Sequence, residues 1–127
     1  MLPALSQRML TPRDLQQRAE TFAIDVVTLC RGLPPTPEGR NIRDQLGRAA
    51  TGVASNYRAT CRARSRAEFV AKLGVVIEEA DESHMWLGML IRLQLASGTE
   101  VERLQHEADE LTAIFVASRR TASRSRR

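Results

Sequence analysis

The chain has 127 residues, of which 43% are hydrophobic and 27% are charged, and its formal net charge is +4. This size fits one globular domain, and no apolar run approaches the roughly 20 residues that a membrane-spanning helix needs. Only 4% of the residues are aromatic, so the core must be aliphatic, and alternating strand-like runs are absent. We predict an all-α, antiparallel up-down four-helix bundle at residues 11–118, between a flexible arm at 1–10 and a disordered Arg-rich tail at 119–127.

The first helix is predicted to begin at Pro12 with Thr11 as its N-cap, because the first helical position needs no amide donor. Apolar residues spaced by three and four then form one continuous face. These residues are Leu15, Ala19, Phe22, Val26, Leu29 and Leu33. Prolines within 34–37 end this helix. Because the connection is short, the second helix, which begins near Glu38, should run antiparallel to the first.

The second and third helices are separated by an arginine-rich turn. Small residues crowd the middle of the second helix at 47–55, which lets a neighbouring helix approach closely. Ser65 is the predicted N-cap of the third helix, with Glu68 as its capping-box partner. The third helix should extend to Ser97.

The fourth helix is predicted to follow directly after Gly98, which suits the left-handed position that ends a helix. Thr99 would be its N-cap, with Glu102 completing a second capping box. Its apolar face is formed by Val101, Leu104, Ala108, Leu111 and Phe115.

Four segments of the sequence together carry a family resemblance. They are residues 45–50 (QLGRAA), Asn56, residues 64–69 (RSRAEF) and residues 78–82 (EEADE). Over about residues 20–116 the chain resembles the four-helix-bundle family known as the S23 or 23S rRNA intervening-sequence protein family. The resemblance implies an up-down four-helix bundle in a ring-like homopentamer. It also implies a fold similar to the accessory protein of diversity-generating retroelements, which binds nucleic acid.

One segment departs from the family pattern. Residues 56–60 read NYRAT, where many members carry Asn-Ile-Ala-Glu-Gly, so any role of that acid and that glycine does not carry over. Asn56 lies on or beside the apolar face of the second helix. Two interpretations stay open: a buried amide that fixes helix register, or a surface residue.

Basic residues gather around the second turn, since residues 40–66 contain seven Arg and Asp44 as the single acid. Arg58, Arg62, Arg64 and Arg66 form a candidate patch for a phosphate backbone. The alternative is that these arginines are solvated or pair with acids of the third and fourth helices. The patch lacks interleaved aromatic residues, which argues against base stacking.

The C-terminal tail offers a second basic segment, which begins with Arg119 and Arg120. It is either an arm that binds nucleic acid or a solubilising disordered end.

The sequence does not favour an enzyme. In the acidic run before His84, only Asp81-x-x-His84 approximates a di-iron motif, and Arg103 occupies the corresponding position before His106. We therefore predict no catalytic residue, metal, cofactor or small-molecule substrate. Cys30 and Cys61 lack CxxC spacing, so reduced thiols and a cytoplasmic location are expected.

Residues 85–95 are apolar around the whole helix, which is more than one bundle core requires. Ile24, Val27 and Cys30 widen the apolar face of the first helix in a similar way. We predict an obligate homo-oligomer, and the family resemblance, rather than physics, implies five subunits. The candidate interface residues are Ile24, Val27, Met85, Trp86, Met89 and Leu93.

Two functional hypotheses follow. The first is a non-enzymatic oligomeric scaffold that contacts nucleic acid, with RNA preferred over DNA. The alternative is a structural or protein–protein interaction module whose charges serve solubility.

Overall fold

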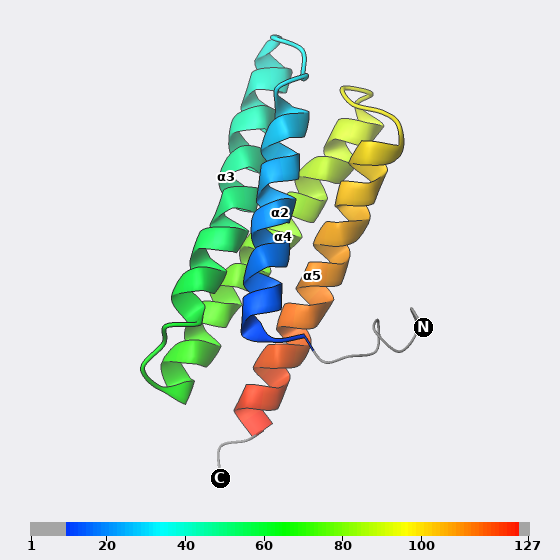
Figure 1. The fold of residues 1–127 in the computed structure, drawn as a ribbon. Helices are drawn as coiled ribbons and strands as arrows, with labels where there is room; N and C mark the ends of the chain where they lie inside the picture. The colour runs from blue at the N-terminus through cyan, green and yellow to red at the C-terminus, as the bar shows by residue number, and fades with distance from the viewer. Residues whose placement is uncertain (1–9, 125–127) are drawn as a thin grey trace, which may run out of the picture.

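The computed structural model describes residues 10–124, which fold into four helices without a strand, as the all-α prediction requires. The helices are α2 (Pro12–Cys30), α3 (Pro37–Thr60), α4 (Arg66–Arg92) and α5 (Thr99–Arg124). In Figure 1 the chain rises along α2, returns along α3, rises along α4 and returns along α5. Within the described residues, no helix combines the length and apolar character needed to cross a bilayer. Of the predicted arm at 1–10, residues 1–9 lie outside the described part, as do 125–127.

Each of the first two helices begins with a Pro that follows a Thr N-cap. The Thr11 hydroxyl accepts a hydrogen bond from the Asp14 amide at 3.0 Å, and the Asp14 carboxylate accepts one from the Thr11 amide at 3.1 Å. Pro12 follows at N1, so the predicted start of α2 is confirmed. At α3, the Thr36 hydroxyl accepts from the Gly39 amide at 3.1 Å and Pro37 is at N1.

Ser65 caps α4, and its hydroxyl accepts from the Glu68 amide at 3.0 Å. The return bond of the predicted capping box is displaced by one residue. The Glu68 carboxylate accepts from the amide of Arg64 at 2.7 Å, rather than from that of Ser65. The acid therefore fastens the arginine-rich turn to the first turn of α4.

The third helix ends at Arg92, before the predicted end at Ser97. Gln94 takes the left-handed conformation there, with φ of 59°. Its amide donates to Ile91 O at 3.0 Å, and the Leu95 amide donates to Leu90 O at 2.9 Å. This pair of bonds is a Schellman motif, which satisfies carbonyl groups left free at a helix end.

The fourth helix differs from its prediction at both ends. Thr99 is its first helical residue rather than its cap, and the Glu102 amide donates to Gly98 O at 3.5 Å. The helix also continues to Arg124, so residues 119–124 belong to α5 and not to a disordered tail. The disorder prediction for this segment assumed that residues too polar to be buried do not form a helix. An established helix extends by one hydrogen bond per residue, and Arg and Ala favour that extension.

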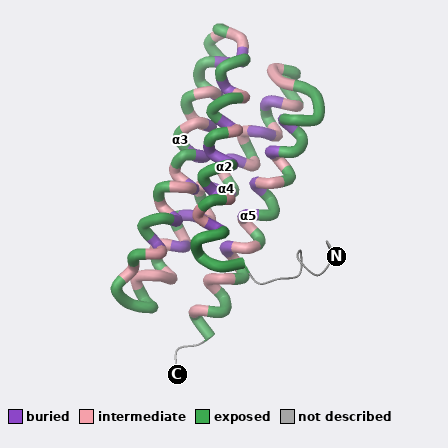
Figure 2. The backbone as a smooth tube through the Cα atoms, in the orientation of Figure 1, coloured by how far each residue is buried: buried purple, intermediate pink, exposed green. Residues whose placement is uncertain are grey.

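The core occupies the centre of the bundle, where the buried positions of all four helices meet (Figure 2). Tyr57 of α3 and Phe115 of α5 meet there with ring centroids 5.2 Å apart. The buried hydroxyl groups of Thr60 and Ser83 donate to carbonyls one turn earlier in their own helices. The fully buried large side chains are Phe22, Phe115, Leu46, Leu73, Leu87, Leu90, Leu104, Leu111, Val26, Val53, Val76 and Val101.

The contact between α2 and α5 is carried partly by ion pairs. Arg18 binds Glu107 through two bonds of 2.7 and 2.8 Å, and its Nη2 also lies 2.7 Å from Glu110 Oε1. Arg103 of α5 donates to Asp25 of α2 at 2.9 Å. By contrast, α2 packs more extensively on α3 than on α5.

Candidate nucleic-acid interface

The arginine-rich turn between α3 and α4 surrounds a surface hollow of about 320 Å³. Three of the four arginines predicted for the turn line it. Its lining consists of Ser55, Arg58, Ala59, Arg62, Arg64, Glu68 and Lys72. We call these residues the basic hollow. Sequence reasoning missed Lys72, although its spacing of four residues from Glu68 places both side chains on one face of α4.

The basic hollow carries a local excess of positive charge. Its four cationic side chains and one carboxylate give a formal charge of 4 − 1 = +3. Arg58 lies 3.9 Å from Glu20 of α2, but both side chains are largely exposed, and such pairs contribute little. Among residues 10–124, the guanidinium groups of Arg62 and Arg64 make no ion pair or side-chain hydrogen bond. These charges are therefore available to an anionic ligand.

The shape of the basic hollow suits a phosphate better than a base. Ser55 and Ala59 contribute short side chains, so a ligand can approach α3 closely. No aromatic residue is among the lining residues, so the hollow offers no platform on which a base could stack. The geometry supports contact with a sugar-phosphate backbone without sequence readout.

Arg66, the fourth predicted residue of the patch, lies elsewhere. It lines a separate hollow of about 420 Å³ together with Ala67, Val70 and Ser123 of α5. Arg66 is the first residue of α4, so the chain has turned from the α3 side to the α5 side at this point. Three of the four predicted arginines therefore line the basic hollow, and Arg66 does not.

Arg119 and Arg120 lie on α5, outside the basic hollow. Arg119 is half-buried, and a Cβ atom built on Gly74 of α4 would be 3.5 Å from its Nη1. Arg120 is exposed. The structure thus separates these two arginines from the turn, and gives Arg119 a position against α4 rather than in a loose arm.

Asn56 makes its hydrogen bond within its own helix. Its Nδ2 donates to Gly52 O at 2.8 Å, and the residue is half-buried. The described contacts give it no bond to another helix, so they do not support a role in fixing register. In the same segment, Tyr57 packs in the core against Phe115, while Arg58 faces the basic hollow.

The acidic run of α4 shows no metal-binding geometry, since the described residues contain no group of three potential ligands. Burial raises the pKa of Glu79, and the neighbouring carboxylates of Glu82 and Glu78 raise it further, against the opposing charge of Arg48. Glu79 packs over Gly52, where an added Cβ would lie 2.9 Å from the carboxyl carbon. This acid therefore marks a close approach of α3 and α4.

The predicted interface residues divide into two surface groups. On α2, Ile24 and Val27 are exposed to 64% and 36%. At α4, the exposed side chains are Met85, Met89 and Leu93, together with Val75, which sequence reasoning missed.

Two other residues of the predicted apolar faces are less accessible. Trp86 is half-buried, and its Nε1 donates to Glu82 Oε2 at 3.0 Å. Cys30, which was expected to widen the apolar face of the first helix, is instead part of the core. Since the backbones of α2 and α4 do not approach each other closely and each packs on both α3 and α5, the two exposed groups lie on diagonally opposite helices of the bundle.

Comparison with known proteins agrees with the four-helix fold. The family model of the 23S rRNA-intervening sequence protein matches residues 13–117. A crystal structure from Bacteroides thetaiotaomicron VPI-5482, described as a protein with unknown function from the S23 ribosomal protein family, has a TM-score of 0.79 and 24% sequence identity to this chain. The alignment covers 87% of this chain and 99% of that one. A search of curated proteins finds no significant match.

Proposed function

Because the chain belongs to the 23S rRNA-intervening sequence protein family, we propose that it is a non-enzymatic helical bundle that binds the phosphate backbone of RNA. The observation that carries this proposal is the basic hollow, with its formal charge of +3 and with guanidinium groups of Arg62 and Arg64 that form no ion pair within residues 10–124. Arginine binds phosphate through two parallel hydrogen bonds and is weakly hydrated, so it loses little on contact. The free thiols Cys30 and Cys61 fit the cytoplasm, where RNA is available.

The test is the salt dependence of binding to a labelled single-stranded RNA, measured by fluorescence anisotropy. Four phosphate contacts at one hollow would lower the affinity about 50-fold between 50 and 200 mM salt, given a slope of about 0.7 per contact. The variant Arg62→Gln/Arg64→Gln removes two contacts, so its affinity should fall only about 7-fold over the same range.

The matched control is Arg13→Gln/Arg31→Gln, which removes the same charge from exposed positions on or next to α2. It should keep the wild-type salt slope. Absence of binding at 50 mM salt, or equal slopes for the wild type and the Arg62/Arg64 variant, would refute the proposal. If only Arg119→Gln/Arg120→Gln flattened the slope, the contact would lie on α5 instead.

We also propose that the antiparallel bundle self-associates. The supporting observation is the pair of exposed apolar groups on the diagonally opposite helices α2 and α4. Contact between two unlike faces is head-to-tail, and such contacts form a ring when the rotation between neighbouring subunits closes. Full burial of one large aliphatic side chain contributes about 1.5–3 kcal/mol, so several per subunit would offset much of the cost of association. The family resemblance favours five subunits.

Light scattering at micromolar concentration tests self-association, because one chain has a mass of 14.2 kDa. We expect a mass close to five times this value. A folded 14.2 kDa monomer at that concentration would contradict the proposal. Salt separates the two functional hypotheses, since an apolar protein partner would stay bound at concentrations that release RNA.

A further inference from the structure

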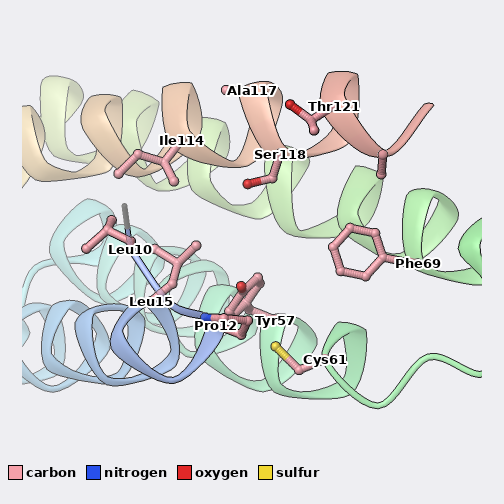
Figure 3. Close-up of a pocket in the computed structure, with 11 residues that line it drawn as sticks. Leu10, Pro12, Leu15, Tyr57, Cys61, Phe69, Ile114, Ala117, Ser118 and Thr121 are labelled. Atoms are coloured by element: carbon pink, nitrogen blue, oxygen red, sulfur yellow. The ribbon is translucent and has the colours of Figure 1, made fainter. Parts of the chain in front are cut away.

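A further hollow, which is apolar and has a volume of about 590 Å³, lies at the end of the bundle where α2 begins and α5 ends. Side chains from all four helices line it (Figure 3). They include Leu15 of α2, Tyr57 of α3, Phe69 of α4 and Ile114 of α5. We call this the end hollow, and it is separate from the basic hollow.

The end hollow exists because two neighbouring helices differ in length at this end. The cap at Thr11 stops α2, whereas α5 continues beyond the core residue Phe115 as far as Arg124 (Figure 1). The last turns of α5 lie beside α4, but on the side of α2 no described helix lies opposite them. Small side chains of α5 line that side of the hollow, namely Ala117, Ser118, Thr121 and Ala122.

We propose that the N-terminal segment, residues 1–9, docks in the end hollow of its own chain. Leu10 is the first residue that the structure describes, and it lines the end hollow (Figure 3). The segment is therefore attached to the bundle at the rim of this hollow. Six of the nine residues in MLPALSQRM are apolar, and Arg8 has the single charged side chain.

The length and the tether favour this occupant. Nine residues extend at most about 30 Å, which is ample for a hollow that adjoins their own attachment point. A short tether also supplies an effective concentration of about millimolar, which a free partner rarely reaches. The opposite terminus is a poorer match, because residues 125–127 are Ser-Arg-Arg and would bring charge into an apolar site.

A cysteine in the wall of the end hollow provides a direct readout. Cys61 is half-buried and lines the hollow, whereas Cys30 lies in the core. Burial raises the pKa of Cys30 to about 11, so little thiolate forms at neutral pH and its reaction with a maleimide should be slow. Docking would shield Cys61 in the same reaction, and Cys30 serves as an internal reference for folding.

The experiment compares maleimide labelling rates of the full chain and two double variants, quantified by peptide mass spectrometry. Leu2→Asp/Leu5→Asp places charge at apolar positions of the segment and should raise the Cys61 rate at least fivefold. The matched control, Ser6→Asp/Gln7→Asp, adds the same charge at polar positions and should leave that rate within twofold of the wild type.

Equal Cys61 rates in the wild type and the Leu2/Leu5 variant would overturn the proposal, because the end hollow would then be open. Protection that disappears when the wild type is diluted from micromolar to nanomolar would also overturn it, since the occupant would come from a second copy. If Cys30 too became reactive, the variant would be unfolded. The milder Leu5→Ser would then decide, with the same expected acceleration at Cys61 alone.

Discussion

Two adjacent residues of α4 offer a sharp test of which side chains face another subunit. Met89 is 37% exposed, whereas Leu90 is fully buried in the core. In a monomer, Met89→Glu is a surface substitution and should change the free energy of unfolding by about 0.5 kcal/mol or less. In an assembled subunit, the same carboxylate would enter an apolar contact without a partner, at a cost of several kcal/mol. A loss of about 3 kcal/mol would weaken association more than 100-fold.

Leu90→Glu should behave differently. It removes about 1.5–3 kcal/mol of apolar burial and adds the desolvation of a carboxylate, against a total stability of about 5–15 kcal/mol for a domain of this kind. We therefore expect it to unfold the subunit, while Met89→Glu gives a soluble, folded species of lower mass. Asn41→Glu, at an exposed position in the second turn of α3, controls for added charge.

Size-exclusion chromatography with light scattering gives the mass, and thermal melting followed by circular dichroism gives the stability. The reasoning fails if Met89→Glu leaves the wild-type mass unchanged, because Met89 would then face solvent in the assembly. It also fails if Met89→Glu lowers the melting temperature as much as Leu90→Glu does, because the side chain would then support the subunit core.

Three further predictions concern stability, and each is checked by denaturant unfolding. Gln94→Gly should stabilise the fold by up to about 1 kcal/mol, because glycine adopts the φ of 59° at the end of α4 without the cost of a Cβ atom. Gly39→Ala should destabilise it by about 1–3 kcal/mol, because the new Cβ would overlap the backbone carbonyl of Pro34. Glu79→Gln should stabilise the fold at pH 7: its raised pKa means that the folded chain binds the proton more tightly, so ionisation costs stability as the pH rises through that pKa. That gain should shrink as the pH falls from the raised pKa toward about 4.3, the ordinary pKa of Glu, and should be absent below it, where both states are protonated. A gain independent of pH would contradict the electrostatic cause.

The sequence predicts the helices well because their signals are local. Three- and four-residue apolar spacing marks the buried faces, and Thr11 with Pro12 marks where α2 begins. The end of α4 carries no such signal. Gly98 does adopt a positive φ, of 103°, as expected, but α4 ends earlier, at a left-handed Gln94. There the bonds that close the Schellman motif outweigh the strain at a non-glycine residue.

The candidate site was harder to predict because it depends on the path of a turn. Arg58 lies in the last turn of α3 and Arg62 follows directly after its C-cap, so their proximity is implied by the sequence. Arg66 departs from them because it begins a new helix with its own orientation, and Lys72 joins them from that same helix. No pattern in the sequence fixes the relative rotation of two helices. Exposure at Ile24 and Met89 was predictable, since both lie off the apolar face of their own helix.

The ion pairs between α2 and α5 have a consequence for how the molecule opens. The α2–α5 boundary is the smaller of the two that α2 makes, and ion pairs supply part of it. The more exposed Arg103–Asp25 pair contributes about 0–1 kcal/mol and weakens as salt is added, whereas the bidentate Arg18–Glu107 pair is largely buried and is screened less. The boundary between α2 and α5 should therefore part before the boundaries on either side of α4. In native-state hydrogen exchange, we expect amides of α2 to exchange as one cooperative unit, ahead of those in α3 and α4. Added salt should speed the exchange of α2 selectively, so the attachment of the N-terminal helix to α5 should weaken as the ionic strength rises.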